Sequence, residues 1–277
     1  MPEALAELAA RGIDLLVING GDGTVRDVLT CGRGIFGDDW PAIAVLPKGK
    51  TNALTVDLGV PSEWTLQDAI DAYEAGERVL RRPIEIAASD ESAPSVLGFI
   101  FGAGAFTRAT RAGQGAHRLG AFNSLAVGVT TAWTIAQSLF GSRRNPWRKG
   151  APMTIALGPH GAAMAHSGIG DPEYRQLLFA SSLERMPAGI NPFGPLRKGL
   201  KLVAIDQVSR RSLLLIPLIM MGWISQGLRE RGFHQVSVPD FELTIDDQFI
   251  LDGEAFPAGS YRIGQGPELA FVAPPRS

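Results

Sequence analysis

The chain contains one cysteine, Cys31, so it cannot form an internal disulfide, and no set of cysteine and histidine residues has zinc-site spacing. Its charge is nearly balanced, with 26 Lys and Arg against 28 Asp and Glu, whereas a general binder of nucleic acid would be basic. The longest apolar run, Leu213 to Ile224, is interrupted by Pro217 and falls short of the roughly 20 residues that span a bilayer. We expect no nucleic-acid partner, and we expect this run to form a buried helix of the second domain, with the lining of a lipid tunnel as the alternative.

The first residues show no charged-then-apolar secretory signal. The expected location is therefore cytoplasmic, with peripheral contact to a membrane surface. Hydrophobic residues make up 45% of the 277 positions, which is enough to bury a core in each of two domains. The 33 glycines and 19 prolines predict many turns and short strands.

Two apolar runs near the N-terminus, Ile13–Ile18 and Ala42–Leu46, predict parallel strands that are buried on both faces. Each is followed by a loop rich in glycine, and helices are expected over 3–11 and about 65–74. Strand, loop and helix in this order indicate an open α/β sheet. We therefore predict a nucleotide-binding α/β domain over residues 1–81.

From residue 82 onward, the chain changes to short runs with period-two patterning, separated by turn residues. This pattern indicates a β-rich domain over 82–277, with two helical interruptions at about 119–140 and 209–229. We expect its last strand to pack back on the first domain. The predicted strands are 84–87, 96–101, 153–157, 176–180, 200–205, 236–238, 241–245 and 249–251.

The loop after the first strand, Gly20-Gly21-Asp22-Gly23-Thr24, offers backbone amides without side chains in the way. A helix N-terminus follows, so the loop is suited to a phosphate group. Asp22 would repel phosphate, and it makes chemical sense as a contact to Mg²⁺ or to a substrate hydroxyl. The alternative is a tight turn in which Asp22 caps the helix.

The loop after the second strand presents Lys50, Thr51 and Asn52 at the carboxyl end of the strand, where open α/β sheets bind ligands. A plain strand-to-helix turn capped by Thr51 or Asn52 is the alternative. Neither loop matches the Walker A pattern or the dinucleotide-binding G-x-G-x-x-G pattern.

Three motifs together resemble the diacylglycerol kinase catalytic-domain family, the lipid kinases that also include sphingosine kinases. The first is GGDGT at 20–24. The second is LPKGKTN at 46–52, followed by DLGVP at 57–61, and the third is LDGE at 251–254. GGDGT alone also occurs in NAD kinases, whereas the late DGE favours the lipid kinases. By itself, Asp252-Gly253 reads as an exposed hairpin turn.

The resemblance implies an N-terminal NAD kinase-like α/β domain and a C-terminal β-sandwich domain, with the active site in the cleft between them. It implies an ATP- and Mg²⁺-dependent transfer of the γ-phosphoryl group to the hydroxyl of a diacylglycerol-like or sphingoid lipid, at a membrane surface. Glu254 would be the general base, with Asp252 supporting it and Asp22 holding Mg²⁺. The implied nucleotide-binding residues are Gly20, Gly21, Gly23, Thr24, Arg26, Lys50, Thr51 and Asn52.

The sequence departs from the family pattern at several positions. Lys50 replaces a threonine, Ala53 replaces an aspartate and Arg26 replaces an asparagine. Lys198 and Lys201 stand where bacterial members carry carboxylates that help to hold a structural Mg²⁺. We therefore expect no metal there, and we expect one of these lysines to pair with a nearby acid.

Relatives also carry a strand and loop before GGDGT, so we expect this chain to lack the first βα unit. The exposed sheet edge would then favour a homodimer. Two rival functions are an NAD kinase-like enzyme and a catalytically impaired relative that binds nucleotide or lipid. The basic stretch 143–149 around Trp147 is expected either to contact anionic lipid or to form a solvated loop.

Overall fold

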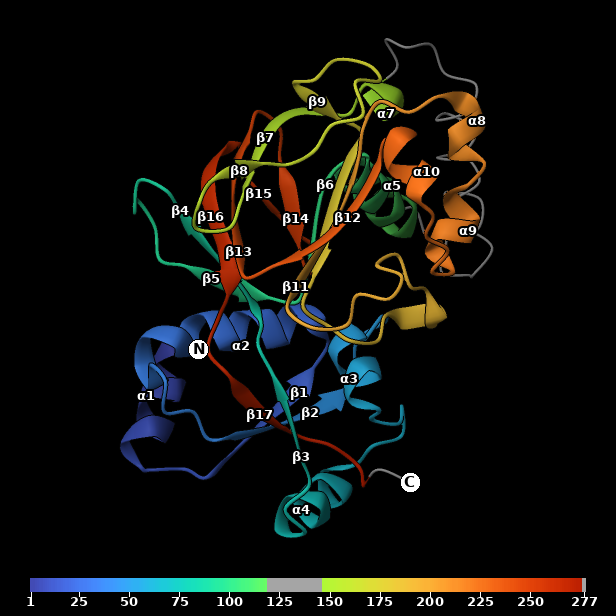
Figure 1. Ribbon diagram of the computed structural model, residues 1–277. Coiled ribbons are helices and arrows are strands. Elements are labelled where there is room, and N and C mark those ends of the chain that lie inside the picture. The colour runs from blue at the N-terminus through green and yellow to red at the C-terminus, as the bar shows by residue number, and fades with distance from the viewer. Residues whose placement is uncertain (119–145, 276–277) are drawn as a thin grey trace.

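The computed structural model describes residues 1–118 and 146–275, which form an N-terminal α/β domain and a C-terminal β domain (Figure 1). The first domain has a four-stranded sheet in the order β1-β2-β17-β3, in which β2 is parallel to both of its neighbours and β3 is antiparallel to β17. Its elements are α1 (Pro2–Ala10), β1 (Leu15–Gly20), α2 (Asp22–Phe36), β2 (Ala42–Pro47), α3 (Ala53–Leu58), α4 (Leu66–Glu74), β3 (Arg78–Arg81) and β17 (Leu269–Val272).

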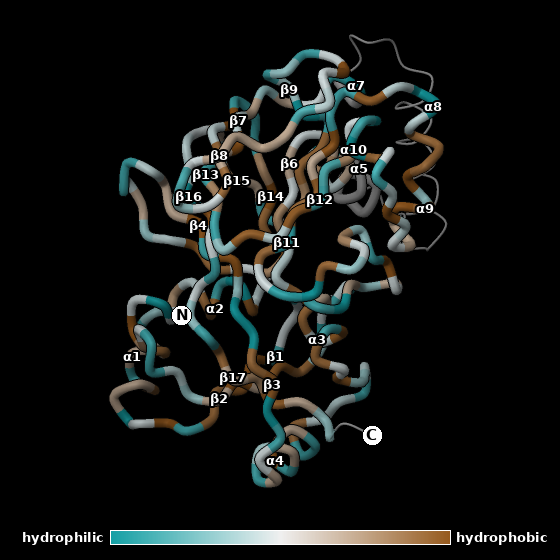
Figure 2. Tube along the Cα trace, viewed as in Figure 1, coloured by the Kyte–Doolittle hydropathy of each residue, from teal (hydrophilic) through white to brown (hydrophobic). Residues whose placement is uncertain are grey.

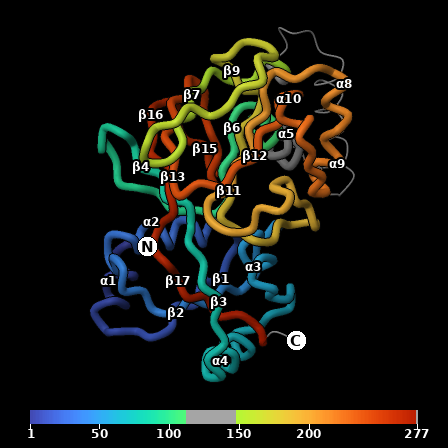
Figure 3. The backbone as a smooth tube through the Cα atoms, in the orientation of Figure 1, coloured from blue at the N-terminus to red at the C-terminus, as the bar shows by residue number. Residues whose placement is uncertain are grey.

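The apolar run that predicts the second strand is almost wholly buried as β2. This burial is expected for a strand with a partner on each side and helices around the sheet. The partner strand β17 comes from the far end of the chain, and Figure 3 shows this red segment entering the blue N-terminal domain. Phe271 of β17 packs against Phe99 of the second domain, with 6.1 Å between ring centroids. The hydrophobic core of the first domain therefore continues into the second.

The second domain contains a six-stranded sheet in the order β12-β11-β10-β6-β14-β15 and a seven-stranded sheet. Six strands of the latter follow the order β5-β4-β16-β13-β7-β8, and the seventh, β9, also pairs with β7. The paired strands of both sheets are antiparallel. The strands are β4 (Ile84–Ala88), β5 (Val96–Gly98), β6 (Ile100–Gly104), β7 (Ala151–Leu157), β8 (Ala162–Ala163), β9 (Tyr174–Arg175), β10 (Leu177–Ser181), β11 (Leu200–Ile205), β12 (Phe233–Val238), β13 (Asp240–Ile245), β14 (Phe249–Leu251), β15 (Glu254–Phe256) and β16 (Gly259–Gln265).

Aromatic side chains fill the space between these two sheets. Phe101 of β6 lies 6.4 Å from Phe241 of β13 and 5.1 Å from Phe249 of β14, measured between ring centroids. All three are fully buried in one apolar cluster that draws on both sheets. The predicted β-sandwich is therefore confirmed.

The helical elements of the second domain lie mainly on one side of it (Figure 1). They are α5 (Ala105–Arg118), α7 (Pro146–Lys149), the 3-10 turn η1 (Pro187–Gly189), α8 (Arg210–Leu213), α9 (Ile216–Met220) and α10 (Gln226–Glu230). The predicted helix at 119–140 and the start of the basic stretch 143–149 lie outside the described residues. Within the described ranges, no helix is long and apolar enough to cross a bilayer.

The prediction of one buried helix over Leu213–Ile224 is wrong. Pro217 occupies the first turn of a new short helix, α9, because proline fits there but breaks a helix interior. Leu213 and Ile219 are buried, whereas Leu214 and Met221 are exposed.

Asp57 of α3 links the two domains by hydrogen bonds. Its fully buried carboxylate accepts from the backbone N–H groups of Glu184 (2.8 Å) and Arg185 (2.6 Å), which follow β10, and from Arg81 Nε (2.6 Å). Loss of these partners would leave a buried charge unpaired, which is costly in free energy. Asp57 therefore fixes the position of the second domain against α3.

Candidate active site

The two loops of the first domain touch backbone to backbone. A Cβ at Gly21 would lie 2.6 Å from the Cα of Gly49, and a Cβ at Gly20 would lie 2.5 Å from the side chain of Thr24. Glycine is therefore required here by close packing of the loops as well as by access to backbone amides. Gly23 differs, because a Cβ there would meet only open space. The loop leads into the 15-residue helix α2, whose N-terminus carries a partial positive charge.

Asn52 shapes the second loop rather than presenting a free side chain. Its backbone has a left-handed conformation, with φ of 48°. Its amide side chain donates to Gly49 O and accepts from Gly49 N, each at 2.8 Å. Lys50 and Thr51 are exposed on the same loop. Of the three residues predicted to bind nucleotide on this loop, Lys50 and Thr51 therefore have exposed side chains that a ligand could contact. The side chain of Asn52 is instead hydrogen-bonded to Gly49.

Asp22 joins the two loops. Its Oδ1 accepts from the backbone N–H of Leu54 at 3.3 Å, and Lys48 N donates to Gly20 O at 3.2 Å. Asp22 is the first residue of α2, and the N-cap position is occupied by Gly21, which makes no side-chain cap. The alternative in which Asp22 caps the helix is therefore wrong.

The acidic motif near the C-terminus forms the tight turn between β14 and β15. Asp252 and Gly253 both have positive φ, at 45° and 87°, which is typical of two-residue hairpin turns. The carboxylate of Asp252 turns inward and accepts from the backbone N–H groups of Phe99 and Ile100, each at 2.8 Å. The motif is thus a hairpin turn, but its aspartate is half-buried and its carboxylate is held by backbone N–H groups, whereas the side chain of a simple surface turn would face solvent.

The pKa of Asp252 is raised to about 7. Burial is the largest cause, and the nearby negative charge of Asp22 adds to it. The two backbone N–H groups and the charge of Arg26 act in the opposite direction but are outweighed. Near neutral pH the carboxyl group of Asp252 is therefore present in both its protonated and its deprotonated form, and the negative charge of Asp22 favours the protonated form.

Arg26 connects helix α2 to the acidic turn. Its side chain is 12% exposed, and Nη1 donates to Leu251 O at 3.4 Å, while Nη2 lies 3.6 Å from Oε2 of Glu254. Nη2 also pairs with Asp27 at 2.6 Å. The Glu254 side chain is 62% exposed. The fold therefore brings Asp22, Arg26, Asp252 and Glu254 into one site between the two domains.

No sequence motif marks Gly98 or the two backbone amides that hold Asp252. A Cβ at Gly98 would lie 2.6 Å from Oδ2 of Asp252 and 2.6 Å from the side chain of Leu251. Only a residue without a side chain leaves this space for the carboxylate. A lone glycine in a strand can signal such a close approach, but it does not say what approaches.

The residues of this site fit a magnesium–nucleotide group. The described part of the chain has no cluster of three or more His, Cys, Asp or Glu residues that could hold a metal ion. Mg²⁺ in phosphoryl-transfer sites usually takes only one or two carboxylates and completes its shell with phosphate and water. Asp22 and Asp252 repel one another, and a cation held by Asp22 would relieve that repulsion.

Lys201 and Lys198 differ in their surroundings. Lys198 is exposed, whereas Lys201 is 1% exposed, and its Nζ donates to the carbonyls of Arg197 (3.3 Å) and Gly199 (3.4 Å). Burial lowers the pKa of Lys201 to about 8, against the opposing charges of Asp57 and Glu184. Within the described residues, neither lysine has a carboxylate at ion-pair distance, so the expected direct pairing is wrong.

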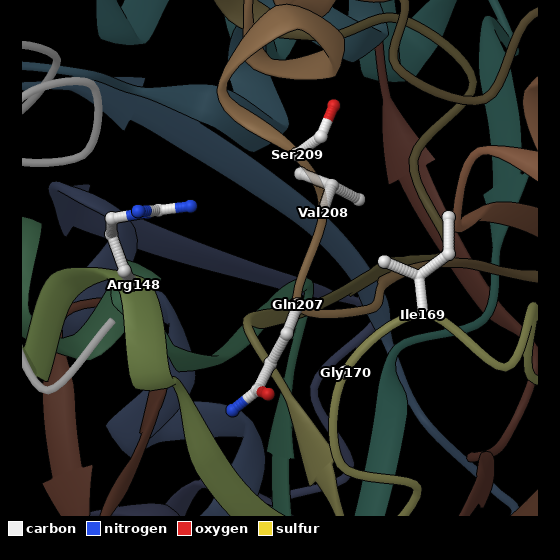
Figure 4. A pocket seen from close by; sticks show the side chains of 6 residues that line it. All are labelled: Arg148, Ile169, Gly170, Gln207, Val208 and Ser209. Atoms are coloured by element: carbon white, nitrogen blue, oxygen red, sulfur yellow. The ribbon is translucent and has the colours of Figure 1, made fainter. Parts of the chain in front are cut away.

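A separate pocket lies in the second domain, away from the predicted site residues (Figure 4). The side chain of Arg148 extends toward Val208 and Ser209 across this hollow. It is lined by Arg148, Ile169, Gly170, Gln207, Val208 and Ser209.

An α/β domain joined to an antiparallel β domain is also the fold of solved structures of diacylglycerol kinases. One from Bacillus anthracis str. Sterne has a TM-score of 0.61 at 14% identity and covers 99% of this chain and 81% of its own. A putative diacylglycerol kinase from the same organism has a TM-score of 0.63 at 16% identity and covers 99% and 82%. At these identities the likeness concerns the fold.

The family comparison concerns the N-terminal part. Residues 2–85 match the model of the diacylglycerol kinase catalytic domain. The chain is 35% identical over 83 residues to the diacylglycerol kinase of Bacillus subtilis (strain 168), which is 30% of this chain and 25% of that protein. It is 34% identical over 68 residues to the lipid kinase YegS of Escherichia coli (strain K12), or 24% and 22%. These matches span about a quarter of the relatives' length, and the resemblance that the motifs indicate is confirmed over this region.

Proposed function

We propose that this protein is an ATP-dependent lipid kinase that phosphorylates the hydroxyl of a diacylglycerol-like or sphingoid lipid presented at a membrane surface. The observation that carries the proposal is the meeting of the glycine loop and the acidic turn, through the contacts of Arg26 with Leu251 and Glu254. A phosphoryl transfer needs a phosphate cradle and a proton acceptor at one place, and these segments supply both.

When bound, ATP with Mg²⁺ would supply the phosphoryl group and neutralise its charge. The chain's own contribution is then positioning and proton transfer. Asp22 would offer a carboxylate oxygen to the cation, and the amides at the start of α2 would bind the phosphates. Lys50 and Thr51 are exposed on the neighbouring loop, where they can contact the nucleotide.

We assign the proton-accepting role to Asp252 in place of Glu254. A general base works best when its pKa lies near the working pH, and the pKa of Asp252 is about 7. Two backbone N–H groups hold its carboxylate in one orientation. Glu254 is more exposed and contacts Arg26, which suits a residue that orients Arg26 and the turn.

The test is turnover of labelled ATP over a panel of lipids in mixed micelles, with NAD as a soluble competitor substrate. We expect lipid phosphorylation and none of NAD. Asp252→Asn should lower kcat by about 10²–10⁴-fold, the range for loss of a general base, whereas Glu254→Gln should lower it by about tenfold. Phosphorylation of NAD but of no lipid would contradict the proposal.

The reverse order of the two variants would return the base role to Glu254. If ATP binds but neither lipid nor NAD is phosphorylated, the protein is the catalytically impaired relative. The lipid kinase is favoured because the acidic turn of the second domain lies at the glycine loop, and the family match lies in the loop-bearing domain.

A further inference from the structure

Five large apolar side chains form an exposed surface on the helical side of the second domain. We call this surface the apolar patch. It lies over α8, α9 and the residues after them, and Figure 2 colours much of the α9 stretch brown. The patch consists of Leu214 (65% exposed), Leu218 (48%), Met221 (80%), Trp223 (41%) and Ile224 (40%).

The patch is held in place by buried neighbours from the same segment. Leu213, Ile219 and Leu228 are 6%, 3% and 1% exposed and belong to the main apolar core. Pro217 lies in the first turn of α9, and Gly222 has a φ of 93°, so the chain turns sharply after this short helix. The segment therefore presents some apolar side chains outward because others anchor it inward.

The border of the patch is positively charged. Arg210 and Arg211 precede it, Arg229 and Arg231 follow it, and all four are exposed. With Glu230 as the only acid between 209 and 231, four positive charges and one negative charge give +3, in a chain whose net charge is −2. Arg148 adds a further cation at the hollow beside Ser209, where the segment begins (Figure 4).

We propose that the apolar patch docks the protein on an anionic phospholipid bilayer. The segment is too short to span a membrane, but exposed leucine, methionine and tryptophan side chains can enter the boundary between headgroups and acyl chains. Tryptophan favours this interface, and arginines beside an inserted apolar surface attract anionic headgroups. A symmetric contact with a second copy would bring two basic borders together, and like charges repel, so a bilayer fits the combination of apolar centre and basic border better. The inference rests on the proposed function, for which it supplies the route to a membrane lipid.

The direct test is flotation with vesicles of phosphatidylcholine alone or mixed 3:1 with phosphatidylglycerol, without ATP. We expect the wild-type protein to bind the anionic vesicles, and Leu218→Gln/Met221→Gln and Arg211→Gln/Arg231→Gln each to weaken binding at least tenfold. Matched controls are Leu66→Gln and Arg262→Gln, an exposed leucine and an exposed arginine elsewhere, which should stay within about twofold. Thermal melting shows that each variant is folded.

Two results would overturn the docking proposal. One is a folded Leu218→Gln/Met221→Gln variant that binds anionic vesicles as tightly as the wild-type protein does. The other is a dimer in the wild type that this variant converts to a monomer, since a second copy would then cover the patch.

Turnover of a soluble short-chain diacylglycerol separates this inference from the proposed function. Its rate should be unchanged in the patch variants, because no bilayer is involved, while turnover of long-chain lipid in vesicles falls with binding. If the short-chain lipid is phosphorylated but the patch variants bind vesicles normally, docking is wrong and the kinase function stands. If the patch mediates vesicle binding but no lipid is phosphorylated, the docking proposal stands and the proposed kinase function is wrong.

Discussion

Arg26 and Glu254 come from opposite ends of the chain, and 3.6 Å separates Nη2 of the arginine from Oε2 of the glutamate. The same guanidinium lies 3.4 Å from the carbonyl of Leu251. One side chain of helix α2 thus contacts both sides of the turn that carries Asp252. Arg26 stands where the family pattern has asparagine, and its cation is directed toward the acidic turn.

We expect Arg26→Gln to lower lipid turnover by about tenfold while changing the free energy of unfolding by less than about 1 kcal/mol. The stability effect is small because both carboxylate partners of Arg26, Asp27 and Glu254, are at least half exposed, and ion pairs that reach solvent contribute about 0–1 kcal/mol. The activity effect follows from a less well-held turn beside Asp252. Turnover assays and urea unfolding measure the two effects. Arg82→Gln, which removes an exposed pair with Glu268 at 3.3 Å, is the control and should leave turnover unchanged; an equal loss in both variants would contradict the positioning role.

Gly98→Ala should displace the carboxylate of Asp252. The added Cβ would lie 2.6 Å from Oδ2 of Asp252. This distance is shorter than a van der Waals contact, so the turn must shift. We expect kcat to fall by at least tenfold with the KM for ATP within about twofold, because the glycine loop is not touched. Gly34→Ala is the matched control, since a Cβ there meets nothing within 4 Å. Unchanged kcat in a folded Gly98→Ala variant would show that the position of Asp252 is not critical.

The raised pKa of Asp252 predicts a pH dependence of stability and of activity. The folded state binds this proton more tightly than the unfolded state, so the contribution to stability is full below about pH 4 and is lost as the pH rises to about 7. Asp252→Asn should remove this dependence, and the wild type should lose stability relative to the variant between pH 5 and pH 8. Turnover should rise over the same range because the base must be deprotonated. Urea unfolding at both pH values and a pH–kcat profile test this, and parallel curves for the two proteins would contradict it.

The parts of the fold that the sequence predicts are those governed by continuous local patterns. Both apolar runs near the N-terminus become parallel strands, but only β2 is buried on both faces, because β1 lies at the edge of the sheet and its Leu15 and Val17 are half-buried. Period-two runs become the strands of the sandwich. The helix expected over Leu213–Ile224 fails because hydrophobicity alone does not show which side chains face a core. Pro217 signals a break, but the exposure of Met221 depends on neighbours that are distant in sequence.

In the candidate site, too, some features follow from local sequence and others depend on residues that are distant in sequence. The glycine loop and the acidic turn can be predicted because their residue types carry the chemistry. Their meeting depends on Arg26, and the environment of Asp252 depends on the amides of Phe99 and Ile100. Backbone amides are present at nearly every residue, so no sequence motif marks the two that matter. This is why the motifs favoured Glu254 as the base, while burial favours Asp252.

Lys201 provides a further prediction, on stability. The pKa of its ammonium group is lowered to about 8, mainly by burial. The unfolded state therefore binds more protons between about pH 8 and 10.5, and stability should rise with pH over that range. Lys201→Met removes the buried charge, so the variant should lack this rise and be about 1–2 kcal/mol more stable at pH 7, because burial desolvates the ammonium group and no carboxylate of the described residues lies at ion-pair distance to offset that cost.

Urea unfolding at pH 7 and pH 9.5 measures this effect, with Lys198→Met as the control because that side chain is exposed. The control should follow the wild type at both pH values. A variant that is destabilised at pH 7 would mean that the hydrogen bonds of Nζ to Arg197 and Gly199 contribute more than burial of the charge costs. In that case the cation at this position supports the fold, and its removal should also loosen the nearby contact between Asp57 and Glu184 that joins the two domains.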